Sequence, residues 1–310
     1  MREKKMRFGF LTGLLSIMLL LASCGAAGQQ EAYSPEDVLN PDKFNDQLTI
    51  RYFYLPSDEE KSGDAALIRT PDGVTMMVDA GVPKTGPYVD QYLDKLGIDK
   101  IDVAVMTHPH YDHIGGYTTL MHTKEIGKAY TTRVPHDTAT YRTVESLIQE
   151  KNIPREYLED GHEFMLGEHV KVQVLNPPKG TTDEPLTATS HINNTSFVLK
   201  MTYKDKTFLF TGDLYKAGES DVLERHAEFL DADFMDAPHH GDTTSNSSAF
   251  IDAVSPDVVV FSTNIFQSLR VEERYKSKGA DVYVTGLNGN ILITSDGTDL
   301  NVITEKERPE

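Results

Sequence analysis

Four side chains of types that commonly bind metals crowd into the stretch THPHYDHIGG, from Thr107 to Gly116. They occupy four of six consecutive positions: His108, His110, Asp112 and His113. The stretch directly follows the apolar run IDVAVM, which predicts a buried strand that ends where these residues begin. Side chains at these offsets can converge from two sides and offer enough nitrogen and oxygen atoms for two adjacent cations. Packing them together without a cation would leave unpaired polar groups at a strand end.

Two other segments place ligand-type residues just after an apolar run. FLFTGD ends at Asp213, and ADFMDAPHHG carries the neighbouring pair His239 and His240. Because binding and catalytic residues gather on loops held by a rigid scaffold, three such strand ends predict one site along one edge of the core.

The surrounding sequence predicts strands and helices that hold these ends in place. The turns PDG and YKDK each join two strands into a hairpin. Ser247 or Ser248 is the candidate N-cap of a helix over 247–255, and two further helices are predicted over 88–96 and 219–226. The predicted strands are 48–55, 65–70, 74–81, 101–106, 170–178, 196–203, 206–213, 232–238, 258–263, 280–285 and 290–297.

Two sets of mostly antiparallel strands, each followed by helices, predict a sheet-on-sheet core with helices on the outer faces. No internal stretch has the composition of a domain boundary. We therefore expect one domain over residues 46–304, followed by a short tail over 305–310.

The first 23 residues have the features of a signal peptide, with a basic start, MREKKMR, and an apolar run that is short for a membrane span. LASC, at Leu21–Cys24, resembles the lipobox of bacterial lipoproteins, in which the cysteine is lipidated; an ordinary secretory signal is the alternative. Residues 24–45 are predicted to tether the domain to the extracellular face of the bacterial cytoplasmic membrane. Cys24 is the only cysteine of the chain, which excludes an internal disulfide and a thiolate metal site.

The chain is strongly acidic, with a formal net charge of -18 over 310 residues. Four basic residues and one acidic residue lie in the first 23, so the remainder carries a charge near -21. An acidic surface repels long polyanions, because proteins bind nucleic acid largely by placing Lys and Arg against phosphates. Two basic runs, KAYTTR at 128–133 and LKMTYKDK at 199–206, are candidate phosphate contacts, with solvated surface as the favoured interpretation.

HPHYDHIGG resembles the HxHxDH motif of the metallo-β-lactamase superfamily. The ordered set GDAALIRTPDG, VDAG, THPHYDHIGG, NNTSFVL, FLFTGD and APHHG resembles its ComEC-like branch, the hydrolase domain of DNA-uptake proteins and its free-standing secreted relatives. The likeness covers residues 63–297. It implies an α/β (α+β) fold, the four-layer αβ/βα metallo-β-lactamase sandwich.

The resemblance assigns the metal ligands by position. It implies that one metal is held by His108 and His110, the other by Asp112 and His113, and that Asp213 bridges them. Asp112 is also a catalytic candidate.

In PHHG, the resemblance implies that His240 is a ligand and that His239 faces the substrate. The third ligand of the first metal is His191 or Asn194, and an asparagine there would hold that metal more loosely. Asp79 is expected to orient a ligating histidine from behind, whereas Asp64 is either a similar orienting group or a turn residue.

Isolated histidines elsewhere are interpreted as ordinary structural residues. They are His122, His136, His162, His169 and His226.

The predicted function is a secreted, membrane-anchored hydrolase in which two divalent metal ions, zinc or alternatively manganese, share a hydroxide. His239 is the candidate donor to the oxygen that becomes charged. The resemblance implies phosphodiester hydrolysis, of a small molecule, a wall polymer or DNA, and no protein partner is predicted. The alternatives are a hydrolase of C–N or C–O bonds, such as a β-lactam or lactone, and a non-catalytic binding lipoprotein.

Overall fold

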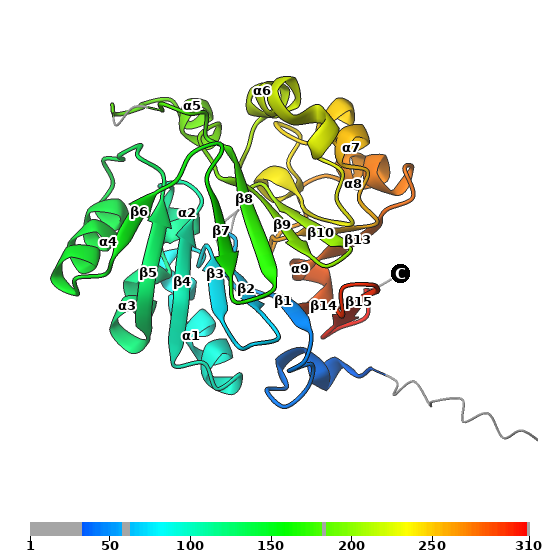
Figure 1. The fold of residues 1–310 in the computed structure, drawn as a ribbon, viewed down its shortest axis with the longest axis horizontal. Helices are drawn as coiled ribbons and strands as arrows, with labels where there is room; N and C mark the ends of the chain where they lie inside the picture. The colour runs from blue at the N-terminus through cyan, green and yellow to red at the C-terminus, as the bar shows by residue number, and fades with distance from the viewer. Residues whose placement is uncertain (1–32, 58–62, 182–183, 309–310) are drawn as a thin grey trace, which may run out of the picture. The chain divides into compact units, whose positions relative to one another are not determined.

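The computed structural model describes residues 33–57, 63–181 and 184–308, and in it two β-sheets pack face to face with helices on both outer sides (Figure 1). The first sheet has the strand order β15-β14-β1-β2-β3-β4-β5-β6, and the second has the order β13-β12-β11-β10-β9-β8-β7. Apolar side chains from both sheets form the central core. The four-layer αβ/βα sandwich that the sequence predicts is therefore confirmed.

The strands of the first sheet are β1 (Leu48–Tyr52), β2 (Ala66–Arg69), β3 (Thr75–Val78), β4 (Lys100–Met106), β5 (Glu125–Thr131), β6 (Arg155–Tyr157), β14 (Ile291–Ser295) and β15 (Leu300–Thr304). Those of the second are β7 (Glu163–Leu166), β8 (Val170–Asn176), β9 (Val198–Tyr203), β10 (Lys206–Phe210), β11 (Phe234–Asp236), β12 (Val258–Phe261) and β13 (Asp281–Val284).

Among the described residues, three helices of seven residues or more cover each sheet. The apolar sides of α1 (Gly86–Lys95), α3 (Tyr117–Thr123) and α4 (Ala139–Glu150) pack on the first sheet. Those of α6 (Lys216–His226), α7 (Ser248–Val254) and α8 (Leu269–Lys276) pack on the second. The shorter segments are η1 (Pro35–Leu39), η2 (Pro83–Thr85), α2 (Tyr111–Ile114), α5 (Thr189–Asn193), η3 (Ala227–Phe229), η4 (Pro238–Gly241) and α9 (Thr285–Asn288).

Strands that lie between helices and the other sheet are apolar on both faces. In β12, Val258 and Val260 join the central core, whereas Val259 and Phe261 pack with the outer helices. Burial on both sides explains the unbroken run VVVF.

The strand directions differ from the expected, mostly antiparallel arrangement. Strands β3 to β6 are parallel to one another, and so are β10 to β13. The helices explain this difference, because a helix that crosses over between two strands returns the chain in the same direction. The carboxyl ends of β4, β10 and β11 precede the three ligand-bearing segments.

Two end segments are packed more closely than predicted. Val38, inside the expected tether, is buried with Leu292 and Ile303, and its carbonyl oxygen accepts a hydrogen bond from Arg51 Nε (2.8 Å). In the expected tail, Arg308 pairs with Glu272. An apolar side chain within a polar run therefore anchors the start of the domain.

Residues 1–32, which include the predicted signal peptide and Cys24, lie outside the described residues. Among the helices that the structure describes, none combines the length and apolar character needed to cross a membrane.

Candidate dinuclear metal centre

The segment that leaves β4 presents the first four predicted ligands. Thr107 fastens this segment to Asp79, because its backbone N–H and its hydroxyl donate to the two carboxylate oxygens (2.8 and 2.6 Å). His110 then precedes the single helical turn of α2, which carries Asp112 and His113. His108 and His113 are buried, so their ring nitrogens meet other residues of the site rather than solvent.

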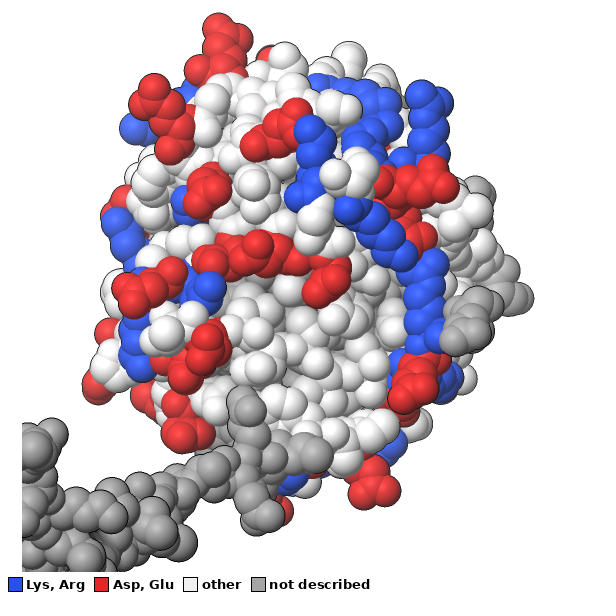
Figure 2. Space-filling model, turned by 90° about the vertical axis from the view of Figure 1, so that its right-hand side faces the viewer, with Lys and Arg blue, Asp and Glu red and all other residues white. Residues whose placement is uncertain are grey.

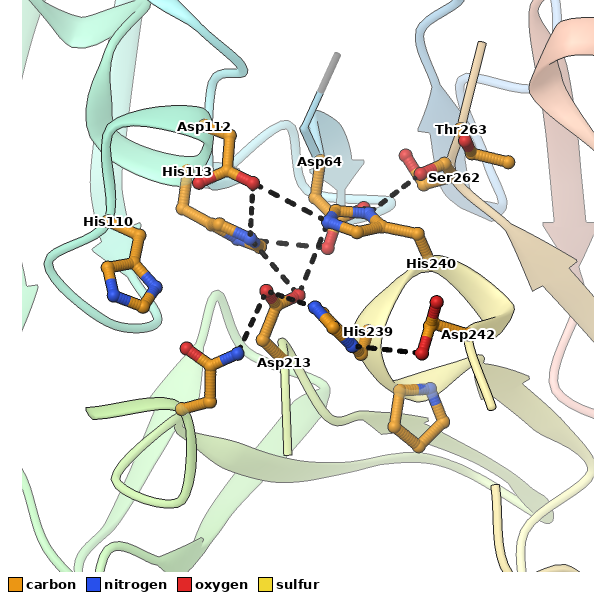
Figure 3. Close-up of polar contacts among 12 residues, drawn as sticks. Asp64, His110, Asp112, His113, Asp213, His239, His240, Asp242, Ser262 and Thr263 are labelled. Atoms are coloured by element: carbon orange, nitrogen blue, oxygen red, sulfur yellow. Dashed lines mark hydrogen bonds and ion pairs between the residues drawn. The ribbon is translucent and has the colours of Figure 1, made fainter. Parts of the chain in front are cut away.

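Asp213 lies at the middle of the site, just beyond β10 (Figure 3). Its Oδ1 is 3.1 Å from His113 Nε2 and 3.4 Å from His240 Nε2. Its other oxygen, Oδ2, is 3.8 Å from His108 Nε2 and 3.5 Å from His239 Nε2. The two oxygens of one buried carboxylate thus face two different sets of nitrogens.

Each set forms a compact group that could hold one cation. Asp112, His113, Asp213 and His240 contribute ligand atoms that all lie within 4.8 Å of one another, and so do His108, His110 and Asp213. The structure therefore brings together all six residues predicted as ligands, in the predicted grouping.

The buried atoms of these groups lack ordinary partners. His113 Nε2, His240 Nε2 and Asp213 Oδ1 are buried, and none of them has a hydrogen-bond partner in the described part of the chain. A buried polar atom without a partner costs roughly 1–3 kcal/mol. Because the three atoms converge on one point and are typical ligand atoms, a divalent cation would satisfy all of them at once. The donor set thus fits the metals that the sequence predicts.

Two carboxylates behind the site orient the ligating histidines. Asp79 Oδ2 lies 2.7 Å from His113 Nδ1, and Asp64 Oδ1 lies 3.1 Å from His240 Nδ1, which is also 2.9 Å from the carbonyl oxygen of Ser262. Both contacts occupy Nδ1 and leave Nε2 directed at Asp213. Asp79 therefore makes the predicted contact, and Asp64 is an orienting group rather than an ordinary turn residue.

Electrostatics couple these groups strongly. Burial opposes protonation of His113, but the carboxylates of Asp213 and Asp79 outweigh it and raise the pKa of His113 well above its usual value. Burial likewise opposes ionisation of Asp213, but His113 and His240 outweigh it and hold the pKa of Asp213 well below its usual value. Positive charge beside the carboxylates therefore stabilises the site. Metal binding would supply that charge and release the protons.

His108 and His110 differ from this pattern. Burial lowers the pKa of His108 well below its usual value and lowers the pKa of His110 as well. Their nitrogens Nε2 and Nδ1 are 3.0 Å apart. Two neutral imidazoles whose ring nitrogens lie this close can both bind the same cation.

The two residues predicted as third ligand of the first metal, His191 and Asn194, do not face the site. His191 is exposed, and Asn194 Oδ1 accepts hydrogen bonds from the backbone N–H groups of Tyr215 (3.2 Å) and Gly218 (3.1 Å) at the start of α6. Asn193 faces the site instead: its Nδ2 is 3.4 Å from Asp213 Oδ2, and its buried Oδ1 has no partner among the described residues. Asn193 is the last residue of the short helix α5 and Asn194 is its C-cap, a boundary that the sequence does not reveal.

The adjacent histidines of PHHG diverge as predicted. Both have positive φ angles, 53° at His239 and 58° at His240, so the chain turns sharply between β11 and α7. His240 is fully enclosed, whereas His239 lines an open cleft beside Asp213. Left-handed backbone at two successive non-glycine residues is uncommon and is typical of functional sites.

The cleft beside the metal ligands has a volume of about 410 Å³. Its described lining contains no Lys or Arg; it consists of His110, Tyr111, Asp112, His136, Thr187, Thr189, Ile192, Asn193, Asp213, Tyr215 and His239. His136, which we interpreted as structural, belongs to this wall, with its ring 5.3 Å from that of His110. Its surrounding sequence offers no pattern that would have shown this.

The other isolated histidines lie away from the cleft lining. His122, His162 and His169 are exposed, and His226 Nε2 is 2.9 Å from Asp160 Oδ2. Side chains of the two basic runs make contacts away from the cleft. Lys200 Nζ donates to the carbonyl oxygen of Phe229 (2.6 Å), and Arg133 lies over the ring of Tyr157. Neither run contributes to the described cleft wall.

The sequence pattern of the metallo-β-lactamase superfamily matches residues 59–263. The chain belongs to this superfamily. A matching relative, ComE operon protein 3 of Bacillus subtilis (strain 168), is 26% identical over 174 residues, which cover 55% of this chain and 21% of that protein. Competence protein ComA of Neisseria gonorrhoeae is 23% identical over 233 residues, covering 73% and 30%. These relatives support the ComEC-like branch, although the chain spans less than a third of either one.

Solved structures show the same superfamily fold. YhfI of Bacillus subtilis, a metallo-β-lactamase fold protein, aligns with a TM-score of 0.50 and 13% identity over 81% of this chain and 100% of that one. The β-hydroxylase CmlA aligns with a TM-score of 0.51 and 14% identity over 79% of this chain and 53% of that one. At these identities the likeness concerns the fold alone.

Proposed function

We propose that this chain is a dinuclear metal-dependent phosphodiesterase that acts on small phosphodiesters. The observation that carries the proposal is the division of the Asp213 oxygens, with Oδ1 facing His113 and His240 and Oδ2 facing His108. A carboxylate in this position can bridge two cations. Metal-dependent hydrolysis is the general activity of the superfamily, and paired cations suit in-line displacement at phosphorus.

The donor set suggests which metal is used. Nitrogen atoms from four histidines favour zinc, whereas the oxygens of Asp112 and Asp213 would also accept manganese. Zinc is our first choice.

The side chains of the site have different roles in the proposed reaction. Two bound cations would supply Lewis acidity and a hydroxide at neutral pH. Burial opposes ionisation of Asp112, but His113 and His240 together outweigh it and lower the pKa of Asp112, which favours its role as an anionic ligand. His239 lines the cleft and is the group we assign as donor to the oxygen that leaves phosphorus.

The cleft favours a small substrate over a long nucleic acid. Its described lining contains no Lys or Arg to grip successive phosphates, and the chain beyond the first 23 residues has a charge near -21. Figure 2, which shows the right-hand side of the view in Figure 1, has Lys and Arg side chains concentrated toward its right-hand edge and others along its left-hand edge, with a broad centre that is uncharged or acidic. A β-lactam or lactone is less favoured, because such a hydrolase is expected to have a third histidine ligand on the first metal, and the candidate His191 is exposed.

The test is hydrolysis of bis-p-nitrophenyl phosphate by purified protein with added Zn²⁺ or Mn²⁺. We expect metal-dependent turnover that disappears in Asp213→Ala, since that variant loses the bridging carboxylate. If protein that binds two ions per chain shows no turnover with either metal, the proposal fails and β-lactams and lactones become the substrates to test.

We further propose that lipidation at Cys24 holds the domain at the extracellular face of the bacterial membrane, where a small or wall-attached phosphodiester is the substrate. The support is the LASC sequence after a basic and apolar start. Cys24→Ala should move the protein from the membrane fraction to the soluble fraction. Unchanged membrane association would contradict a lipid anchor at this residue.

A further inference from the structure

The loop that carries His239 holds its ring with two further side chains. His239 Nδ1 lies 2.6 Å from Thr244 Oγ1. The same hydroxyl donates to Asp242 Oδ1 (2.7 Å), which also accepts a hydrogen bond from the Thr244 backbone N–H (2.7 Å). The loop closes on itself, because the Asp242 N–H donates to the His239 carbonyl oxygen (2.9 Å). These three residues therefore form a continuous chain of hydrogen bonds.

The direction of this chain fixes the proton on the ring. A threonine hydroxyl has one proton, and a carboxylate can only accept, so the proton of Thr244 Oγ1 is directed at Asp242. The hydroxyl oxygen must then accept from His239, which places a proton on Nδ1. The other nitrogen, Nε2, is the atom near Asp213 Oδ2 (3.5 Å) and the cleft.

The ring is also held from the side. The Tyr215 ring packs against it with centroids 4.7 Å apart and planes tilted by 47°. Figure 3 shows His239 between Asp213 on one side and Asp242 on the other. Packing and hydrogen bonding thus restrain both the position and the tautomer of the ring.

We propose that Thr244, held by Asp242, is a positioning residue that keeps His239 protonated on Nδ1, so that Nε2 alone exchanges protons with the substrate. The inference rests on the proposed phosphodiesterase function. In that reaction a water oxygen forms the new P–O bond, and the bond to the leaving oxygen breaks with its electron pair. Nε2, which carries no proton at the start, accepts a proton from the attacking water and then gives it to the leaving oxygen, so the ring ends the reaction in its original form. A neutral ring with the opposite tautomer would already carry its proton on Nε2, beside Asp213, and could not accept the proton of the attacking water.

The first test observes the tautomer directly and does not depend on activity. Nitrogen-15 NMR of the zinc-loaded protein should show His239, assigned from its absence in His239→Gln, as the Nδ1-protonated form. Thr244→Val keeps the shape of the side chain without the hydroxyl and should shift the ring toward the Nε2-protonated form, whereas Thr244→Ser should restore the original form. Thr243→Val is the matched control, because the neighbouring Thr243 is exposed and its side chain is outside this chain of hydrogen bonds.

The second test uses turnover of bis-p-nitrophenyl phosphate. For Thr244→Val we expect kcat to fall about tenfold, a part of the 10²–10⁴-fold contribution of a general acid, with KM nearly unchanged. Thr244→Ser should recover most of kcat, and both variants should bind as many zinc ions as the unsubstituted protein.

Three results would overturn the inference: an Nε2-protonated His239 in the unsubstituted protein, no effect of Thr244→Val on tautomer or kcat, or a loss of bound zinc that explains the fall in kcat. If the NMR result is as expected but the protein cleaves no phosphodiester, the positioning of His239 stands and the proposed function fails.

Discussion

At the scale of single residues, the candidate centre depends on which nitrogen of each imidazole is already occupied. Asp79 and Asp64 engage Nδ1 of His113 and His240, so both rings present Nε2 to Asp213. The ligating histidines depend on the carboxylates that orient them. A substitution of Asp79 or Asp64, which do not touch the cation through these contacts, should therefore still affect cation binding.

Asp79→Asn tests this dependence. The amide can present an N–H where the carboxylate accepts from His113 Nδ1, so the ring loses its orienting acceptor. We expect affinity for the tightest-bound cation to fall about 10–100-fold, as is typical when such a group is lost. Isothermal titration with Zn²⁺ measures the change, and Asp99→Asn, an exposed residue on the approach to β4, is the control. Equal affinities in the two variants would show that Asp79 is only a structural residue.

Asn193 makes the two cation positions unequal. The group around His240 has four ligand residues, whereas the group of His108, His110 and Asp213 has three, with the Asn193 amide beside Asp213. Asn193→His should add a nitrogen ligand and increase affinity for the weaker-bound cation by about tenfold or more, within the range seen for groups that support a metal site. A two-site titration gives both constants. His191→Asn, on the same short helix but exposed, should leave both unchanged.

The residues of the site differ in how far the sequence could predict them. The ligands in THPHYDHIGG, TGD and PHHG were predictable because each follows an apolar run that had to be a strand, and they lie where expected. Asn193 was missed because nothing in NN shows which amide a single helical turn directs inward. His136 was missed because its loop has no periodicity, and only the tertiary fold brings its ring to His110.

At the scale of elements, the strands that end at ligands were the most predictable, since burial on both faces leaves a continuous apolar run. Residues 117–169 were not assigned, although they contain α3, β5, α4, β6 and β7. Strand β7 shows the reason: two of its four residues are exposed and only one is buried, so it lacks a strong apolar pattern. The parallel pairing of β5 with β6 depends on a missed element, because α4 forms the crossover between these two strands.

The close approach of Gly63 to α2 gives an element-scale prediction. Gly63 and Gly73 have similar left-handed φ angles, 80° and 87°, so alanine should cost roughly 1–3 kcal/mol of stability at either position. Only at Gly63 would the new Cβ collide, at 1.5 Å from the Asp112 carbonyl oxygen; at Gly73 it would meet nothing within 4 Å. Gly63→Ala should therefore displace Asp112 and lose zinc, whereas Gly73→Ala should lose stability alone.

Thermal unfolding and metal analysis of both glycine variants separate these effects. Full zinc binding by Gly63→Ala would show that α2 can shift without disturbing the centre.

At the scale of the whole molecule, the fold limits the chemistry without choosing it. A β-hydroxylase shares this architecture, so the sandwich alone does not specify hydrolysis. Overall charge adds a constraint of its own. The chain beyond the first 23 residues is near -21, and the described cleft wall has neither Lys nor Arg. The negative electrostatic potential of the chain would oppose the binding of a polyanion such as DNA.

Ionic strength therefore distinguishes the two substrate classes. A nuclease that grips phosphates with Lys and Arg loses affinity steeply between about 50 and 200 mM salt, because binding releases counterions. Here the dominant long-range term is repulsion, which salt screens. We expect cleavage of single-stranded DNA to be slow and to rise over that range. Turnover of bis-p-nitrophenyl phosphate, which carries one charge, should change little. A steep fall in DNA cleavage with added salt would instead require a basic surface that tracks the nucleic acid, and would make DNA the better candidate substrate.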